Sequence, residues 1–180
     1  MLLRRTKMLK EMANTDLFAI AEEALKSSKI SDRIYMLHCI SSDLGMGAGI
    51  AKPINLRYNC RTKIDEGKYA AFGGEPRKWD NKGYCIVNAY DNESIEESRM
   101  LIVNLVTKKN YWGKPTYTTL SQSLLQAREF LLGQEKGVHN QLILMPRIGC
   151  GLDKLRWNHV REIIATEFDQ NTFKIVECYL

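Results

Sequence analysis

The sequence predicts an α/β fold, a three-layer α/β/α sandwich built on a mixed central sheet. Apolar runs of strand length, such as Ile34–Ile40 and Leu142–Met145, are of the kind that a sheet buries on both faces. Segments with helical spacing lie between such runs, which favours helices on both sides of the sheet and right-handed crossovers. Two glycine loops, at 45–51 and 149–151, each follow an apolar run and precede a helical pattern.

The first half of the chain is predicted to alternate strands and helices. Alanine, leucine and glutamate favour a helix over Leu17–Leu25, and the polar residues before it can cap its start. From Ala48 to Tyr58 the pattern is again helical, with Pro53 tolerated near the start. The polar stretch Asn59–Trp79, with two adjacent glycines, is typical of an excursion or flap. The elements expected here are an edge strand at Thr6–Met12, helices at Leu17–Leu25 and 48–58, and a buried strand at Ile34–Ile40.

The second half continues the alternation. Two β-rich runs, with turn residues at 91–94 between them, predict neighbouring antiparallel strands. Thr116 opens a helix whose apolar stripe repeats every three or four residues, and Gly133 ends it. The elements expected here are strands at Gly83–Tyr90 and Met100–Val106, a helix at Thr116–Gly133, a strand at Leu142–Met145, a helix at Trp157–Phe168 and a strand at Phe173–Tyr179.

Composition sets the class of protein. At 180 residues, with 44% hydrophobic and 26% charged residues, we expect one globular domain over 1–180, acting as a monomer. No run of eighteen apolar residues occurs, and Met1–Arg5 does not begin a secretory signal, so no membrane association is expected.

Five cysteines without CxxC spacing predict reduced thiols, as in the nucleus or cytoplasm, and no zinc site. The net charge of +5 suits an anionic ligand and also an ordinary solvated surface.

The two glycine loops are the strongest local signal. Gly47-x-Gly49 and Gly149-Cys150-Gly151 allow close approach of a ligand to backbone N–H groups near a helix start, which suits phosphate. Neither is a dinucleotide-binding fingerprint or a Walker loop. Either loop alone could simply turn the chain. Because both follow strands, and ligands of α/β sheets bind at the carboxyl ends of strands, we interpret them as two sides of one site.

Lys108 and Asp153 are the candidate chemical groups, although each has an ordinary alternative. Lys108 ends a strand, as solvated lysines commonly do. Its functional interpretation is a nucleophilic amine kept unprotonated by the neighbouring cation Lys109. Asp153 suits a helix cap or, beside a phosphate site, general acid–base chemistry. Cys150 as a nucleophile lacks a histidine partner. The aromatic pair Tyr111 and Trp112 could stack on a sugar or base, or pack.

The chain resembles the macrodomain family, and within it the terminal ADP-ribose protein glycohydrolase branch, from about Asp16 to its C-terminus. The resemblance lies in five separated blocks in the same order. They are His38-Cys39-Ile40-Ser41, Gly45-Met46-Gly47-Ala48-Gly49-Ile50-Ala51, Thr107-Lys108-Lys109, Lys114-Pro115-Thr116-Tyr117, and Met145–Asp153 followed by Trp157.

This resemblance implies an ADP-ribose pocket. The adenine would lie at Asp16, Leu17 and Phe18, and the two glycine loops would enclose the distal ribose and diphosphate from opposite sides. The substrate-binding residues implied are Asp16, Leu17, Phe18, Ser41, Met46, Gly47, Ala48, Gly49, Ile50, Thr107, Pro146, Ile148, Gly149, Cys150, Gly151 and Leu152.

The resemblance also implies a reaction. In that branch the lysine matching Lys108 attacks the anomeric carbon of the distal ribose, and the aspartate matching Asp153 helps to release the covalent adduct. No metal or organic cofactor takes part. Substrates are ADP-ribose esters on glutamate or aspartate of ADP-ribosylated proteins, O-acyl-ADP-ribose and, in some members, ADP-ribosylated nucleic acid. We therefore expect an active glycohydrolase and deacylase.

Three other functions stay open from the sequence. Macrodomain loops bind ADP-ribose without turnover in many relatives, and related macrodomains act as phosphatases on ADP-ribose 1″-phosphate. A nucleic-acid-binding module would instead require affinity that falls steeply with salt. The sequence departs from the family pattern at Thr15, where a glycine is usual, and over 60–80, which aligns poorly.

Overall fold

The fold, in a computed structural model that describes residues 9–27, 33–134, 141–168 and 173–179, is built on one sheet. Strands from β1 to β5 in the sheet order run parallel, whereas the β5–β4 and β4–β3 pairs are antiparallel. The sheet is therefore mixed, as predicted. The strands lie in the order β1 (Leu9–Ala13), β7 (Phe173–Tyr179), β6 (Gln141–Met145), β2 (Ile34–Ser41), β5 (Met100–Lys108), β4 (Tyr84–Ala89) and β3 (Ala70–Phe72).

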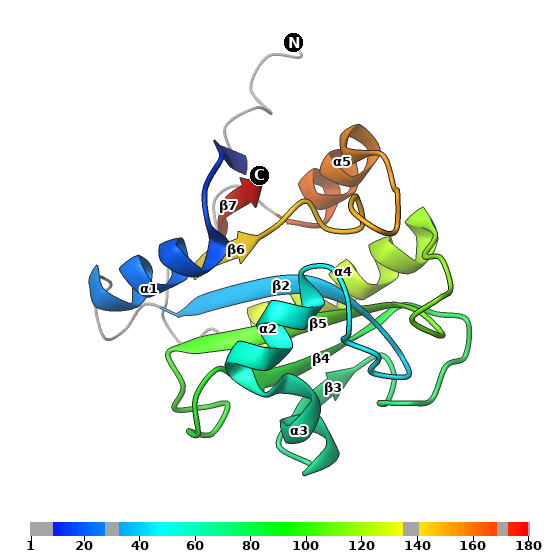
Figure 1. Cartoon of the computed structure of the whole chain (residues 1–180), viewed down its shortest axis with the longest axis horizontal. Helices are drawn as coiled ribbons and strands as arrows, with labels where there is room; N and C mark the ends of the chain where they lie inside the picture. Colours follow the sequence, from blue (N-terminus) through cyan, green and yellow to red (C-terminus); the bar gives the residue numbers. More distant parts are fainter. Residues whose placement is uncertain (1–8, 28–32, 135–140, 169–172, 180) are drawn as a thin grey trace.

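Helices cover both faces of the sheet and complete three layers (Figure 1). One apolar cluster joins α4 and α5 to one face, and a second joins α1, α2 and α3 to the other. None of the helices in the described ranges combines the length and hydropathy needed to cross a bilayer. The helices are α1 (Leu17–Ser27), α2 (Ala51–Tyr58), α3 (Cys60–Asp65), α4 (Tyr117–Gly133) and α5 (Trp157–Glu167).

Most predicted elements are confirmed, with small changes at their ends. The two β-rich runs pair antiparallel as β4 and β5, and β5 continues two residues past the predicted end, to Lys108. Thr116 caps α4 by accepting a hydrogen bond from Thr119 N at 3.1 Å, which completes a capping box. The first strand is β1, and residues 6–8 of the predicted strand lie outside the described residues.

The prediction for 59–79 is wrong. This stretch contributes α3 and the edge strand β3 rather than a flap. The side chains of Cys60 and Ile64 are buried against the sheet, and Lys63 donates from Nζ to Ala89 O at 2.8 Å. Elements of three to six residues are too short to show a periodic pattern, so only packing against β4 identifies them. The second predicted helix was also placed too early, since α2 begins at Ala51 and not at Ala48.

A register shift interrupts the β2–β5 ladder at its carboxyl end. Ile40 pairs with Val106, but Ser41 pairs with Lys108, so Thr107 is the extra residue of a bulge. Bulges re-aim side chains next to functional sites. Here the shift brings Ser41 and Lys108 opposite each other at the edge of the sheet where both glycine loops begin.

A buried polar network crosses the sheet beneath α2 and α3. His38 Nε2 lies 2.8 Å from Asn104 Oδ1, and Asn104 Nδ2 donates to Asn88 Oδ1 and to Ile86 O. Because the amide nitrogen of Asn104 faces two acceptors, its oxygen faces the ring, and Nε2 of His38 carries the proton. Burial lowers the pKa of His38 from 6.5 to about 4.

This histidine predicts a loss of stability in acid. Between pH 6.5 and 4 the unfolded chain binds a proton that the folded chain excludes, so stability falls as the pH is lowered through that window. We expect the free energy of unfolding to fall by about 2 kcal/mol from pH 7.5 to pH 5 because of His38. Urea unfolding at the two pH values should show this difference in the wild type and a smaller one in His38→Gln, which retains a donor for Asn104. An equal difference in both proteins would contradict the assignment.

Candidate active site

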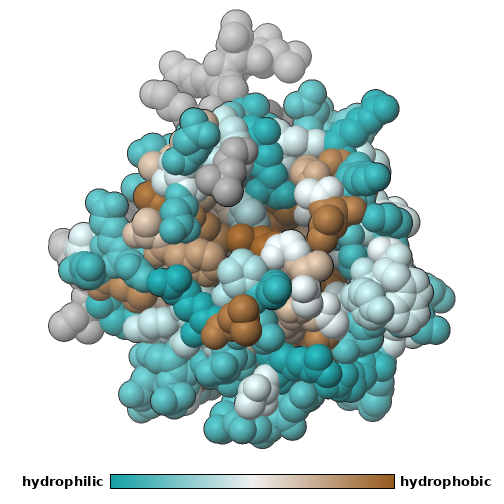
Figure 2. All heavy atoms as spheres, viewed as in Figure 1, coloured by the Kyte–Doolittle hydropathy of each residue, from teal (hydrophilic) through white to brown (hydrophobic). Residues whose placement is uncertain are grey.

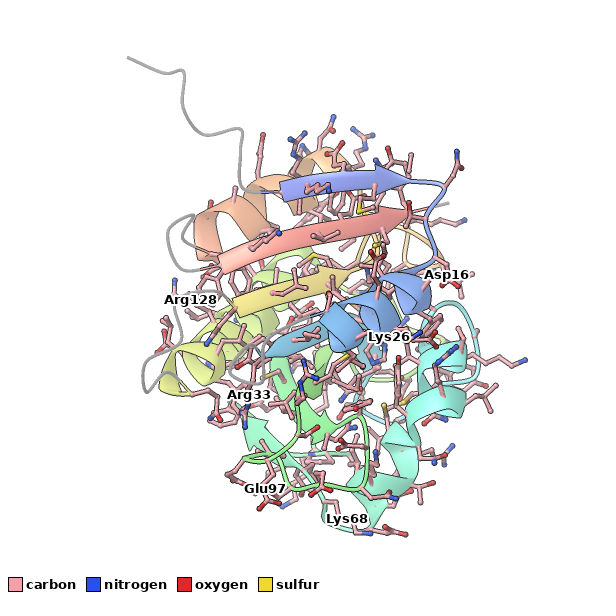
Figure 3. All side chains as sticks on the ribbon, turned by 90° about the vertical axis from the view of Figure 1, so that its left-hand side faces the viewer. Asp16, Lys26, Arg33, Lys68, Glu97 and Arg128 are labelled. Atoms are coloured by element: carbon pink, nitrogen blue, oxygen red, sulfur yellow. The ribbon has the colours of Figure 1, made fainter. Side chains whose placement is uncertain are left out.

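A cleft of about 1160 Å³ lies at the carboxyl ends of the parallel strands, lined by the β1–α1, β2–α2, β5–α4 and β6–α5 connections. Figure 2 shows hydrophobic residues gathered across the middle of the face on which α1 and α2 lie, with hydrophilic residues around them. Figure 3 shows Asp16 where the chain passes from β1 into α1, at the end of the sheet toward which β1, β7 and β6 point. The volume exceeds the range typical of small-ligand pockets, so an extended ligand fits.

The β2–α2 loop offers backbone donors to the cleft. Ile50 is the N-cap of α2 and makes no side-chain cap hydrogen bond. Within the described ranges, the N–H groups of Ala48, Gly49, Ile50 and Ala51 have no hydrogen-bond acceptor. A Cβ added at Gly47 would meet no atom within 4 Å, so the backbone there is open to a ligand. Unpaired N–H groups at a helix start attract anions.

The β6–α5 loop faces this donor loop across the cleft. Gly151, Leu152 and Asp153 also donate their N–H groups to no other described residue. A Cβ added at Gly49 would lie 3.3 Å from Leu152 Cδ1, so the two loops nearly touch. Lys114 Nζ donates to Leu152 O at 2.8 Å and fastens the loop from a third segment. Two opposed rows of N–H donors can hold a diphosphate between them.

Lys108 and Asp153 form an ion pair at one end of this cradle. Lys108 Nζ lies 2.5 Å from Asp153 Oδ1, and the side chains are only 13% and 12% exposed. The charged partner of Lys108 is the carboxylate of Asp153, and the predicted influence of Lys109 on Lys108 stays a prediction. The alternative in which Asp153 caps a helix is also excluded, since the N-cap of α5 is Arg156. Lys108 Nζ and Asp153 Oδ1 are thus within the distance at which a proton can pass between two groups.

The nearby thiols stay protonated. Burial, with the negative charge of Asp153 as a smaller cause, raises the pKa of Cys39 to about 12. Burial also raises the pKa of Cys150 to about 11. A thiolate is the reactive form of cysteine, so neither side chain is a ready nucleophile at neutral pH. All five cysteines carry free thiols.

Asp43 joins the two segments that carry Ser41 and Lys108. Its Oδ1 accepts from Ser41 Oγ at 2.5 Å and from Gly45 N at 3.1 Å, and its Oδ2 accepts from Tyr111 N at 3.1 Å. These hydrogen bonds outweigh partial burial and lower the pKa of Asp43. Because Ser41 donates to Asp43, its oxygen remains free to accept from a ligand. The sequence prediction missed Asp43, although it lies only two residues after the end of the buried strand β2.

The opposite end of the cleft is lined by the β1–α1 connection, the start of α1 and the end of β7. Asp16 Oδ1 accepts from Phe18 N at 2.9 Å and so caps α1. Arg147 donates from Nε to Glu177 Oε1 at 2.6 Å, and its guanidinium lies 3.7 Å from the centre of the Tyr179 ring. Burial raises the pKa of Glu177 despite this partner. In the sheet, β6 and β2 lie between β7, at this end of the cleft, and β5, which carries Lys108.

The structure brings nearly all the predicted residues together in the cleft. Thr107 is the exception, because it is buried in the bulge and lines no part of the cleft. Its carbonyl instead accepts from Thr119 Oγ1 at 2.7 Å. In the described ranges no group of three or more His, Cys, Asp and Glu side chains could hold a metal ion. Lining residues that the prediction missed include Asn55, Arg61, Arg147, Cys178 and Tyr179.

The chain is similar to known proteins in both sequence and fold. No family model matches the sequence. Over 140 residues the chain is 32% identical to the proteins named ADP-ribose glycohydrolase OARD1 of Bos taurus and of Homo sapiens, and the aligned region covers 78% of this chain and of each relative. The macrodomain of Mycobacterium tuberculosis DarG has a TM-score of 0.60 at 17% identity, covering 84% of this chain and 93% of that one. That likeness confirms the fold.

Proposed function

The chain belongs to the macrodomain family, and on this premise we propose that it is an ADP-ribose hydrolase that cleaves esters between ADP-ribose and glutamate or aspartate side chains. The same reaction would deacylate O-acyl-ADP-ribose. One observation carries the proposal. A buried lysine–carboxylate pair, Lys108 and Asp153, lies beside two opposed rows of unpaired N–H donors. The name of the OARD1 relatives agrees with hydrolysis.

The proposed ligand spans the whole cleft. The diphosphate lies between the β2–α2 and β6–α5 loops, where the donors are unpaired. The adenosine extends toward Asp16, whose second carboxylate oxygen has no hydrogen-bond partner among the described residues and can accept from an exocyclic amine. The distal ribose then reaches Ser41 and Lys108, which the bulge places opposite each other.

The proposed reaction proceeds in two steps. Asp153 takes a proton from the Lys108 ammonium, and the freed amine attacks the anomeric carbon of the distal ribose. The bond from that carbon to the ester oxygen breaks, and the glutamate or aspartate leaves as a carboxylate with the bonding electrons. Asp153 passes its proton to the ring oxygen as the ribose ring opens, and the nitrogen loses one proton to water, which leaves a protonated imine on Lys108. Water then adds to the imine carbon and gives a proton to Asp153. Asp153 returns that proton to the nitrogen, and the lysine departs with the proton of the new hydroxyl group, which leaves free ADP-ribose, the Lys108 ammonium and the Asp153 carboxylate.

The test is release of ADP-ribose from a protein that carries mono-ADP-ribose on glutamate. We expect multiple turnover without added metal, and hydrolysis of O-acetyl-ADP-ribose by the same enzyme. Tight calorimetric binding of ADP-ribose without cleavage of either ester would overturn the proposal in favour of a binding module. Phosphate release from ADP-ribose 1″-phosphate, unaffected by Lys108→Ala, would instead favour a phosphatase.

The proposed partners are ADP-ribose and ADP-ribosylated proteins, with ADP-ribosylated nucleic acid as a further substrate to assay. We propose a monomer in a reducing compartment, the nucleus or cytoplasm, because five free thiols suit such a setting.

A further inference from the structure

Exposed apolar side chains gather at the reactive end of the cleft. Tyr111 is 62% exposed, Trp112 67% and Leu152 62%, and all three line the cleft. They are three of the five large apolar side chains that are exposed in the part of the chain that the structure describes. Exposed apolar patches of this kind mark interaction sites. We call Tyr111, Trp112 and Leu152 the rim surface.

The rim surface is held rigidly. Tyr111 N donates to Asp43, and a Cβ added at Gly45 would lie 2.8 Å from Tyr111 Cβ, so the backbones pack closely. Gly113 N donates to Asn110 O at 2.9 Å and closes the turn that carries both aromatic residues. A rigid aromatic anchor loses little entropy on binding a partner. The turn that carries Tyr111 and Trp112 can therefore bind a partner with little loss of conformational entropy.

The rim surface also adjoins the proposed point of reaction. Only Lys109 and Asn110 separate Tyr111 from Lys108, and Leu152 precedes Asp153. Lys114 Nζ donates to the carbonyl oxygen of Leu152 and so joins the aromatic turn to the β6–α5 loop. A group linked to the anomeric carbon beside Lys108 must leave the cleft past these side chains. The macromolecule that carries the ADP-ribose, rather than ADP-ribose itself, would meet them.

We propose that the rim surface binds the polypeptide around the modified carboxylate, with an apolar residue next to it and acidic residues flanking it; this rests on the proposed ester hydrolysis. Tyrosine and tryptophan are enriched among residues that dominate protein interfaces. The rings of Tyr111 and Trp112 are perpendicular, with centroids 4.8 Å apart. A perpendicular pair in contact offers an apolar corner against which one aliphatic side chain can pack, whereas successive nucleobases stack on ring faces that lie side by side.

Charge supports an acidic partner. Lys109 and Lys114 are exposed on the two sides of the aromatic pair in sequence. Neither takes part in an ion pair with any other described residue. Lysines without a carboxylate partner attract carboxylates of a substrate without determining its affinity, and Lys114 Nζ, which donates once to Leu152 O, keeps two further donors for them.

The test compares binding of two ligands to the Lys108→Ala protein, which keeps the rim surface intact. The ligands are ADP-ribose and a peptide that carries ADP-ribose on one glutamate, beside a leucine and two further acidic residues. We expect the peptide to bind about tenfold more tightly than ADP-ribose, and Trp112→Ala in the same background to remove that gain. Replacing the peptide leucine with glycine should have the same effect. Leu132→Ala replaces an exposed apolar side chain on α4 that does not line the cleft, so it is the matched control and should keep the gain.

Each other result overturns the proposal. Equal loss of affinity for both ligands in Trp112→Ala would place Trp112 in the ADP-ribose pocket. Equal binding of both ligands to the Lys108→Ala protein would show that the rim contacts no peptide. A gain that appears only with an ADP-ribosylated single-stranded oligonucleotide would assign the surface to nucleic acid. Because binding is measured without turnover, failure of the proposed hydrolysis is detected separately, in the wild-type release assay.

Discussion

Lys108→Ala is expected to abolish ester hydrolysis, with kcat lowered by about three orders of magnitude or more, while ADP-ribose still binds. The physical reason is that the amine is the attacking group, and removing a nucleophile eliminates the first step of the proposed reaction. The donors proposed for the diphosphate are backbone N–H groups of other segments, so binding of the product should change little. Release of ADP-ribose from the modified protein measures the first quantity, and calorimetry the second.

Lys108→Arg is the control for charge. Arginine retains a cation for Asp153, but its guanidinium stays protonated and cannot attack. We therefore expect Lys108→Arg to be as inactive as Lys108→Ala, although its fold should be better preserved. If Lys108→Arg keeps a tenth or more of wild-type activity, Lys108 acts through its charge and the adduct mechanism is wrong. Thermal unfolding of both variants excludes loss of the folded state as the cause.

Asp153→Asn is expected to lower turnover by about a hundredfold to ten-thousandfold, the range for a positioned acid–base group. Asparagine fills the same space but accepts no proton, so neither activation of Lys108 nor addition of water is assisted. The slower second step should let the covalent ADP-ribose adduct accumulate. Intact-protein mass spectrometry after borohydride reduction should detect it on Lys108.

The double variant Lys108→Ala with Asp153→Asn separates the two roles. It should form no adduct, because the amine is missing. An adduct that persists in the double variant would mean that another side chain is the nucleophile, with Cys39 and Cys150 as the nearest candidates despite their raised pKa values. Full turnover in Asp153→Asn would assign the 2.5 Å ion pair to stability alone.

The buried strands and the helix with a regular apolar stripe were predictable from sequence. The runs that became β2, β5, β6 and β7 are apolar enough to identify as buried strands, and α4 shows both a capping residue and a regular stripe. These signals are local, since they depend only on the spacing of apolar side chains along one segment. The stretch that became α3 and β3 lacked such a signal, because short elements are determined by what they pack against.

The site was predictable in its parts. Glycine spacing and the resemblance located both loops, and the structure places them on opposite sides of one cleft, with the Lys108–Asp153 ion pair at one end. The misassigned residue is Thr107, whose position in a bulge depends on the register with β2. The missed residue Asp43 acts through hydrogen bonds to Ser41 and to Tyr111, which lies 68 positions away in the chain.

The sequence by itself determined that this is an α/β protein with two glycine loops and a candidate lysine and aspartate, since these depend on residue types and local spacing. Only the tertiary structure decided that Lys108 pairs with Asp153, that their thiol neighbours stay protonated, and that Tyr111, Trp112 and Leu152 form one exposed rim. The physical reason is that charge pairing, burial and exposure are properties of distances between segments far apart in the chain, which parallel strand order brings to one edge of the sheet.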